Sequence, residues 1–465
     1  MSAYARRRAG LLPALCAIAF ASAPVSARDF VLADLLARAG GGALTVDGRT
    51  RSALYQEAVP FDAALRAQRA RGEAFVNTTF VPAQASISAR DGLGPLFNSA
   101  SCVSCHRGLR RAPAIAGPGP APPSLVFQLS ARDAAGHMGA HPVYGAELNI
   151  AAVPGVPIEA APRIDYSAIA GRHDDGTPWT LRVPHYAFER LSYGPLDGAR
   201  YSPRIASGLQ GLGLLEAVPA AAILAAADPD DANGDGISGR ANWIRDENGR
   251  RRLGRYGWKA NHPTLRAQTV AAFRAEQGLV AALPSGSNCG ARQPACRAAA
   301  HGGEPEIAPA DLDAVIAFLR TLPVPARRHL ELPAVQRGAS RFIDAGCVAC
   351  HRPMLLTGEK AALPLLARQR IHAYTDLLLH DLGSGLADGR PDREASGREW
   401  RTAPLWGIGL DGEAGATRSL LHDGRARTLE EAILWHGGEA DAARRRYSHL
   451  DADSRAELIA FLQSL

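Results

Sequence analysis

Two short segments of the chain carry the pattern Cys-x-x-Cys-His, at residues 102–106 and 347–351. The chain's own residue frequencies would produce roughly 0.003 such motifs by chance, so two copies are a strong signal. The spacing suits covalent attachment of a c-type haem, because two thiols reach two vinyl groups on one porphyrin edge and the next imidazole ligates the iron. The sequence therefore predicts two haems, attached to Cys102, Cys105, Cys347 and Cys350 and ligated by His106 and His351.

Two other uses of paired cysteines fit the sequence less well. A zinc ribbon places its two Cys-x-x-Cys knuckles about 15–20 residues apart. Here the first cysteines of the two motifs lie 245 residues apart. A thioredoxin-like motif has no need of a histidine directly after it, still less in two copies.

The N-terminus has the pattern of a signal peptide. Three arginines at positions 6–8 precede an apolar run over residues 11–21 that ends in small residues, which predicts a signal peptide over residues 1–27. The run is short for a membrane span and no second long apolar stretch follows. We therefore expect a periplasmic protein without a stable membrane span.

Export also decides how the remaining cysteines are interpreted. Cleavage removes Cys16, which leaves Cys289 and Cys296 in a loop rich in Gly, Pro and Ser. In an oxidising compartment two cysteines so close together are expected to form a disulfide.

The charge of the chain gives no reason to expect nucleic acid. Lys and Arg number 52 and Asp and Glu 46, but the arginines are scattered among the acids, and lysine occurs only at Lys259 and Lys360. The leader carries three of the arginines and no acid, so the net charge falls from +6 to +3, and four haem propionates would offset about four positive charges. With 46% hydrophobic residues the chain is globular, and a collagen-like, coiled-coil or disordered class is excluded.

Internal repetition indicates the elements that must position the two motifs. Residues 316–322 and 459–465 share the pattern Ile-Ala-Phe-Leu-x-x-Leu, in amphipathic stretches that resemble the closing helix of a cytochrome c domain. Upstream, Phe97 and Phe342 each stand five residues before the first haem cysteine and follow a glycine, at 92 or 338. We take these as matching positions in two repeats.

The predicted fold is mainly α, with two tandem cytochrome c-like haem domains at residues 28–325 and 333–465, joined by a Pro-rich connector. Each repeat has a Thr-Leu pair downstream of its haem histidine. The separation between the histidine and the threonine is 158 residues in the first repeat (His106 to Thr264) and 77 in the second (His351 to Thr428). The first domain is therefore predicted to carry a large loop-rich insertion, roughly over residues 110–255.

The insertion contains two kinds of candidate ligand. His137, Met138 and His141 are candidates for a second ligand of the first haem iron, and the sequence does not choose among them. Asp231, Asn233 and Asp235 match the first oxygen positions of a calcium loop, but the twelfth position is Asn242 and not Glu. Calcium and a solvated Asp/Asn/Gly turn both remain possible interpretations of this segment.

The Thr-Leu pair of the second repeat predicts a sixth ligand for the second iron. Thr428 and Glu431 form a capping box, and the helix that they begin is expected to end at the glycines 437–438. His436 joins the apolar stripe of this helix. A histidine on an apolar face is usually a core residue, but a nearby iron favours the ligand interpretation.

At these residues the chain resembles the bacterial di-haem cytochrome c peroxidase superfamily, and more closely its di-haem oxidoreductase (putative peroxidase) branch, often labelled thiol oxidoreductase. The resemblance covers most of the mature chain. The motifs that carry the closer match are Gly92-Leu93-Gly94-Pro95-Leu96-Phe97-Asn98, Gly211-Leu212-Gly213-Leu214-Leu215-Glu216, Gly254-Arg255-Tyr256-Gly257-Trp258-Lys259-Ala260 and the segment from Leu421-His422-Asp423-Gly424 to Glu431.

The resemblance implies roles for four residues. In the superfamily the N-terminal haem reacts with peroxide and the C-terminal haem receives electrons. A Trp lies between the two haems, and a catalytic Gln follows it ten residues later. Trp258 and Gln268 keep this spacing. The catalytic Glu normally follows ten residues after the Gln, but position 278 is Gly here and the nearest acid is Glu276. The ligand of the C-terminal haem lies about fourteen residues after the His of the His-Asp-Gly motif, where this chain has His436.

The sequence therefore predicts an exported di-haem oxidoreductase that reduces hydrogen peroxide, with a small redox protein or cytochrome as electron donor. Two alternatives stay open. One is a di-haem electron carrier without peroxidase activity, and the other is a di-haem oxidase that modifies a partner protein.

Replacing His436 tests its assignment as an iron ligand. Imidazole favours ferric iron more than a thioether does, so His436→Met is expected to raise the reduction potential of one haem and leave the other unchanged. A redox titration followed in the visible spectrum measures both potentials, and identical potentials in the two proteins would contradict the assignment.

Overall fold

The computed structural model describes residues 27–465 except 49–50, 87–89, 134, 247, 282–286 and 411–418. The predicted signal peptide and Cys16 lie outside the described residues, apart from position 27. Across the part of the chain that is described, no helix is long and apolar enough to cross a membrane.

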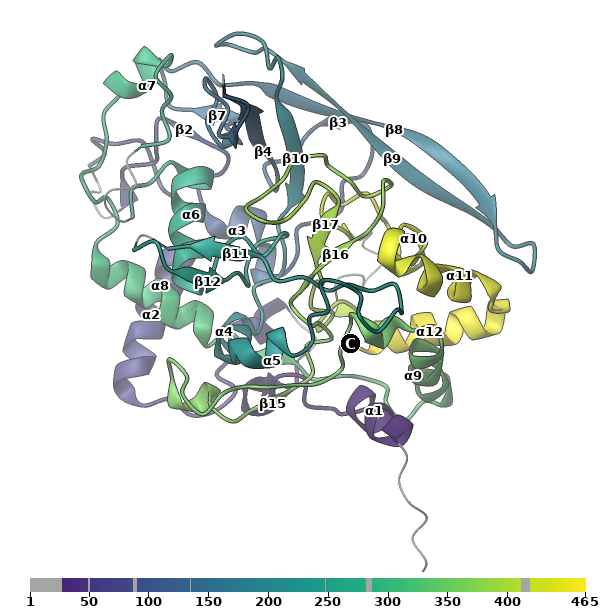
Figure 1. Cartoon of the computed structure of the whole chain (residues 1–465). Helices are drawn as coiled ribbons and strands as arrows, with labels where there is room; N and C mark the ends of the chain where they lie inside the picture. Colours follow the sequence, from purple (N-terminus) through teal and green to yellow (C-terminus); the bar gives the residue numbers. More distant parts are fainter. Residues whose placement is uncertain are drawn as a thin grey trace, which may run out of the picture.

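The helices form two groups on opposite sides of the molecule (Figure 1). The first group includes α2 (Ala63–Asn77), α6 (Leu265–Gln277) and α8 (Pro309–Arg320), and the second α9 (Pro333–Asp344), α10 (Leu429–Leu434), α11 (Asp441–His449) and α12 (Ala452–Ser464). The remaining helices are α1 (Ala27–Leu35), α3 (Cys102–Cys105), α4 (Leu212–Ala217), α5 (Ala220–Leu224) and α7 (Pro294–Ala298).

Each group contains one pair of helices that cross at a glycine. In the first, α2 packs on α8, and a Cβ at Gly72 would lie 2.0 Å from the carbonyl oxygen of Ala314. In the second, α9 packs on α12, and a Cβ at Gly338 would lie 2.0 Å from the carbonyl oxygen of Glu457. The closing helices α8 and α12 that the sequence predicts are confirmed, and each has the same kind of partner.

The structure corrects one match between the repeats. Phe97 lies in a short strand, β2 (Leu96–Phe97), whereas Phe342 lies in α9. The residue that corresponds to Gly338 is therefore Gly72 and not Gly92. A long connection separates α2 from Cys102, while α9 ends three residues before Cys347, so the first repeat is interrupted both before and after its haem motif.

Strands make up much of the insertion, and the prediction of a mainly α fold with a loop-rich insertion is wrong on this point. A four-stranded antiparallel sheet joins β4 (Leu125–Arg132), β5 (Met138–Gly139), β6 (Glu147–Leu148) and β10 (Arg200–Ile205). A second sheet joins β3 (Gly119–Pro120), β8 (Ala161–Arg172) and β9 (Pro178–Glu189). Two-stranded pairs complete the set: β1 (Thr45–Val46) with β13 (Val324–Pro325), β2 with β7 (Ala151–Ala152), β11 (Trp243–Arg245) with β12 (Arg251–Leu253), β14 (Leu355–Leu356) with β15 (Arg370–Ile371), and β16 (Leu379–Asp381) with β17 (Glu399–Arg401).

A long hairpin of β8 and β9 extends from the insertion across the top of the molecule (Figure 1). Its turn contains Asp175-Gly176, and Gly176 has a φ of +85°, a conformation that glycine adopts without strain. Isoleucine, tyrosine, valine and phenylalanine alternate with polar residues along the strands, which is the pattern of a half-buried β-strand.

The hairpin fastens the first half of the chain to the second. At its tip Asp175 forms an ion pair with Arg455 of α12, at 2.8 Å, and the backbone N–H of Asp174 donates to the carbonyl oxygen of Ser448. Nearer its base, the guanidinium of Arg182 donates to the carbonyl oxygens of Gly424 and Arg425. The insertion therefore binds the C-terminal group of helices.

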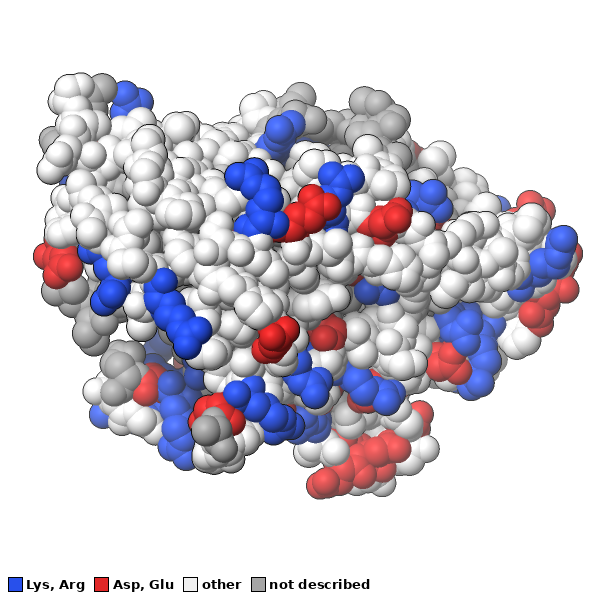
Figure 2. All heavy atoms as spheres, turned by 90° about the horizontal axis from the view of Figure 1, so that it is seen from above, with Lys and Arg blue, Asp and Glu red and all other residues white. Residues whose placement is uncertain are grey.

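The surface carries both signs of charge. Acidic and basic side chains are interspersed on the face drawn in Figure 2 and do not gather in one basic patch. The scattered arginines of the sequence thus remain scattered on this face.

The glycine crossing predicts the effect of adding one methyl group. Gly72→Ala would place its Cβ against the α8 backbone, and such overpacking costs about 1–3 kcal/mol of unfolding free energy. Gly139→Ala is the control, because a Cβ there meets nothing within 4 Å, and its change should stay within about 0.5 kcal/mol. Denaturant unfolding measures both variants, and equal stabilities would contradict the predicted close contact.

Candidate active site

A cavity of about 270 Å³ lies next to the first haem motif. Its wall is formed by α3, by the end of β10 and by one face of α6, among other segments. The structure brings six of the predicted site residues to this one cavity: Cys102, Cys105, His106, Trp258, Gln268 and Glu276. These residues are up to 174 positions apart in the sequence, from Cys102 to Glu276.

The imidazole of His106 is held in the orientation that an iron ligand needs. Its Nδ1 lies 2.6 Å from the carbonyl oxygen of Ser207, and because a carbonyl only accepts, Nδ1 carries the proton. Nε2 is then left with a lone pair for iron. Ser207 lies two residues after the end of β10, so the insertion supplies the acceptor.

The second motif repeats this arrangement. Nδ1 of His351 donates to the carbonyl oxygen of Tyr374 at 3.0 Å, and Nδ1 of His436 donates to the carbonyl oxygen of Ala432 at 2.7 Å. Burial, with a smaller contribution from the nearby His436, lowers the pKa of His351 to about 4. Both imidazoles are therefore neutral, close to each other and protonated on Nδ1, which suits two ligands of one iron.

These residues fit two haems. Each motif presents two cysteines beside a histidine whose Nε2 is available, and the first faces a cavity. One other group of possible metal ligands occurs in the described part of the chain: Cys350, Asp376 and His380. Attachment of haem would make Cys350 a thioether, and His380 is already bound between Asp376 and Glu439, at 2.9 and 2.7 Å.

Helix α6 places Gln268 and Glu276 on the cavity wall. The hydroxyl of Thr264 accepts the N–H of Ala267 and caps the helix, as the Thr-Leu repeat predicts. The two side chains are eight residues apart, a little over two helical turns, so they project from the same face. Oε1 of Gln268 and Oε2 of Glu276 are both buried without a hydrogen-bond partner among the described residues.

The structure explains why position 278 is not an acid. Gly278 ends α6 with a φ of +68°, and a Cβ there would lie 2.6 Å from the Cα of Gly94. A side chain is therefore excluded at this position. Glu276 in the last turn of α6 is the carboxyl that reaches the cavity, and burial together with the nearby Glu147 raises its pKa well above the usual range.

Trp258 touches the cavity and both halves of the chain. Its indole N–H donates to the carbonyl oxygen of Ile205 at 2.9 Å, and its ring packs on the insertion core and on the core around α9 and α12. The N–H of Ile205 in turn donates to the carbonyl oxygen of His422 at 2.7 Å. His422 stacks on Trp400 with ring centres 3.8 Å apart, so hydrogen bonds through the backbone of Ile205 join Trp258 to an aromatic stack in the second half.

Lys259, the residue after Trp258, anchors this part of the chain to the second half of the molecule. It is fully buried, and its ammonium donates to Asp388 at 2.9 Å and to the carbonyl oxygens of Arg390 and Ser396. Burial lowers the pKa of Lys259 to about 8, although Asp388 acts in the opposite direction. Two features of the sequence single out this residue, the rarity of lysine in the chain and its place in the Gly254–Ala260 motif.

The candidate calcium loop is a series of backbone turns in this structure. Asp231 accepts the N–H of Gly236, Asn233 accepts the N–H of Asp235, and Asp235 accepts the N–H of Ile237. Calcium binding there stays a prediction.

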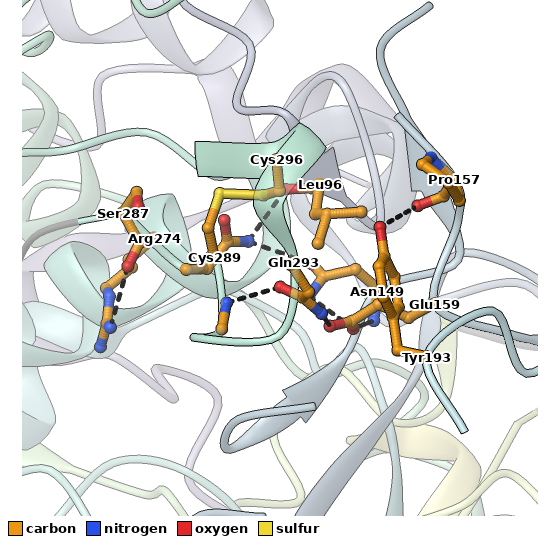
Figure 3. The surroundings of a disulfide bond; sticks show 12 residues. Leu96, Asn149, Pro157, Glu159, Tyr193, Arg274, Ser287, Cys289, Gln293 and Cys296 are labelled. Carbon is orange, nitrogen blue, oxygen red and sulfur yellow. Dashed lines mark hydrogen bonds between the residues drawn. A yellow bond between two sulfur atoms is a disulfide. The ribbon is translucent and has the colours of Figure 1, made fainter. Parts of the chain in front are cut away.

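Cys289 and Cys296 form a disulfide (Figure 3). Within the loop that it closes, the amide of Gln293 donates to the buried carboxylate of Glu159, which also accepts the backbone and side-chain N–H groups of Asn149. The disulfide thus anchors one edge of the insertion.

Three candidate ligands of the first haem iron do not line the first cavity, and one histidine that does line it was not predicted. His137 is exposed in the turn before β5, Met138 lies in β5, and Nδ1 of His141 accepts two backbone N–H groups, from Val143 and Tyr144. None of the three lines the cavity, but His262 does. Burial lowers the pKa of His262 to about 4, so this imidazole is neutral.

The site has the donor set of a haem oxidoreductase, with polar groups on the cavity wall at the first motif and two buried histidines at the second. A family model described as "Di-haem oxidoreductase, putative peroxidase" matches residues 196–465, which is more than half of the chain. The chain belongs to this di-haem oxidoreductase family.

Two solved structures are similar over most of their own length. Hydrazine synthase from Kuenenia stuttgartiensis matches with 15% identity and a TM-score of 0.37, covering 90% of this chain and 94% of that one. A MauG-like protein associated with microbial copper homeostasis matches with 19% identity and a TM-score of 0.27, covering 59% of this chain and 93% of that one. At such TM-scores these two structures add nothing to the family assignment. A comparison with curated proteins found no significant match.

Removing the counter-charge of Lys259 is expected to destabilise the site. Asp388→Asn leaves a buried ammonium without its carboxylate, which costs about 3–5 kcal/mol near neutral pH. The loss should shrink as the pH rises through about 8, the pKa of Lys259 in the folded protein, because a neutral lysine needs no counter-charge. Denaturant unfolding at several pH values measures this, with the exposed Asp133→Asn as control; a loss independent of pH would contradict it.

Proposed function

We propose that the protein is an exported di-haem c-type oxidoreductase that reduces hydrogen peroxide at the N-terminal haem, with electrons received through the C-terminal haem. The observation that carries the proposal is the first cavity, where Gln268 and Glu276 face the same space as Cys102, Cys105 and His106. When bound, the haem would supply the iron at which the peroxide O–O bond is cleaved.

The chain's own residues would supply the proton chemistry. Peroxide cleavage needs a group that moves a proton from the inner to the outer oxygen and a donor beside the leaving hydroxide. Glu276 is placed for the first role and the amide of Gln268 for the second, because both project from one face of α6 into the cavity. Overall, peroxide, two protons and two electrons give two waters.

Electron supply would use the second half of the chain. His351 and His436 would be the protein ligands of the second iron, and a haem held by two protein side chains would supply electron transfer. Trp258 would lie between the two sites, and a small redox protein or cytochrome would be the donor. Export is supported by the disulfide, which forms and persists in oxidising compartments.

His262 favours one competing function, a di-haem electron carrier. It is a neutral imidazole on the wall of the first cavity, and as a sixth ligand it would close that iron to peroxide. The spectrum separates the two functions. A high-spin population that changes on adding peroxide supports the peroxidase, whereas two low-spin haems inert to peroxide support the carrier.

Substitutions at the cavity wall test the proposed roles. Gln268→Ala and Glu276→Ala are each expected to cut peroxide turnover about 100-fold or more, with haem content unchanged. The exposed Gln336→Ala and Glu331→Ala are matched controls and should keep wild-type turnover. Unaffected turnover in both cavity variants would place the reaction elsewhere.

A further inference from the structure

We propose that Glu147 shares one proton with Glu276 and thereby sets the protonation state of the carboxyl group at the cavity wall. Glu147 lies in β6 of the insertion, and nothing in the sequence motifs singles it out. Its use in catalysis rests on the proposed peroxide reduction, but the shared proton is a property of the pair itself.

Asn98 links the side chain of Glu147 to the backbone of Glu276. Its backbone N–H donates to the carbonyl oxygen of Glu276 at 2.7 Å, and its side-chain amide donates to Oε1 of Glu147 at 3.0 Å. Asn98 itself is fixed, because its Oδ1 accepts the N–H of Ile150. The side chains of Glu147 and Glu276 hydrogen-bond to each other, and Asn98 ties together the two segments that carry them.

No cation neutralises the pair. Neither carboxylate forms an ion pair with any residue that the structure describes, and Glu147 is 8% exposed. Arg204 and Arg390 are the nearest cations to Glu147, but both bind Asp392, at 2.9 and 3.0 Å. Two buried carboxylates without a counter-ion repel each other, and a proton shared between them removes the repulsion and forms a hydrogen bond.

The other groups that face the pair do not change this. The thiols of Cys102 and Cys105 lie near Glu276, and burial keeps the pKa of each raised, so they carry no charge. Glu159 lies beyond Glu147 and is satisfied by Asn149 and Gln293. Burial raises the pKa of both Glu147 and Glu276, which favours a protonated form of the pair.

A shared proton gives the pair a use in the proposed reaction. As the inner peroxide oxygen loses its proton to Glu276, Glu276 passes its own proton to Glu147. Both transfers reverse when the outer oxygen leaves as water, so the pair ends with the proton that it began with. The electrons come from the haems, as in the proposed function. Glu147 would thus be a positioning residue that acts through Glu276.

Infrared titration of the haem-loaded protein tests the shared proton directly. The C=O band of a protonated carboxyl group is followed against pH in a Glu159→Gln background, because Glu159 is buried nearby and has a raised pKa of about 7. With both carboxyl groups present, the band should be lost in two separate steps. Glu147→Gln and Glu276→Gln should each leave one step at a pH between those two.

Either variant alone decides the result, should the other fail to fold. The proposal is overturned if the carboxyl group that remains titrates at the same pH with and without its partner. Glu159→Gln compared with wild type is the matched control, since it should remove one band and leave the two steps of the pair in place.

Peroxide kinetics separate this inference from the proposed function. In the Glu147→Gln variant the rise of the peroxide rate constant with pH should move to higher pH by about one unit or more, because Glu276 itself must then lose its proton. If no form of the protein reacts with peroxide, the proposed function fails while the infrared result stands. If the peroxide rate is normal and its pH profile does not move, Glu147 has no part in the reaction.

Discussion

The hydrogen bond from an imidazole Nδ1 to a backbone carbonyl is the constraint on which the rest of this structure depends. It occurs at His106, His351 and His436, and each acceptor comes from a different part of the fold: Ser207 after β10, Tyr374 in a loop, and Ala432 within α10. A carbonyl that fixes a ligand must itself be fixed, so the surrounding elements have to be rigid. Tyr374 shows this, because its hydroxyl donates to the carbonyl of Leu35 at the end of α1.

The insertion is therefore part of both halves of the molecule. It supplies the acceptor for His106, the carboxyl group that faces Glu276, and the backbone of Ile205 that links Trp258 to His422. A pair of cytochrome c-like repeats without it would lack one wall of the first cavity. The insertion therefore positions the residues by which the first haem site differs from the second.

Sequence spacing could predict the parts of the site that lie close together along the chain. The haem motifs, the Thr-capped helices α6 and α10 and the closing helices α8 and α12 all follow from local patterns. The hairpin also had a local signal, alternating apolar residues around an Asp-Gly turn. Glu147 and the stack of Trp400 on His422 had none, because tertiary packing alone brings them to the site. His262 lies between Trp258 and Gln268 in the sequence, and that proximity was a local signal for its place at the cavity.

The contacts of the β8–β9 hairpin also constrain the order in which the chain can fold. Its tip binds Ser448 and Arg455, residues that lie 274 and 280 positions later in the sequence than the hairpin residues they meet. The N-terminal half cannot reach its final packing until almost the whole chain is available, and contacts of such long range slow folding. The two halves are therefore expected to fold as one cooperative unit. The N-terminal half is synthesised first but completes its packing only when the C-terminal helices are present.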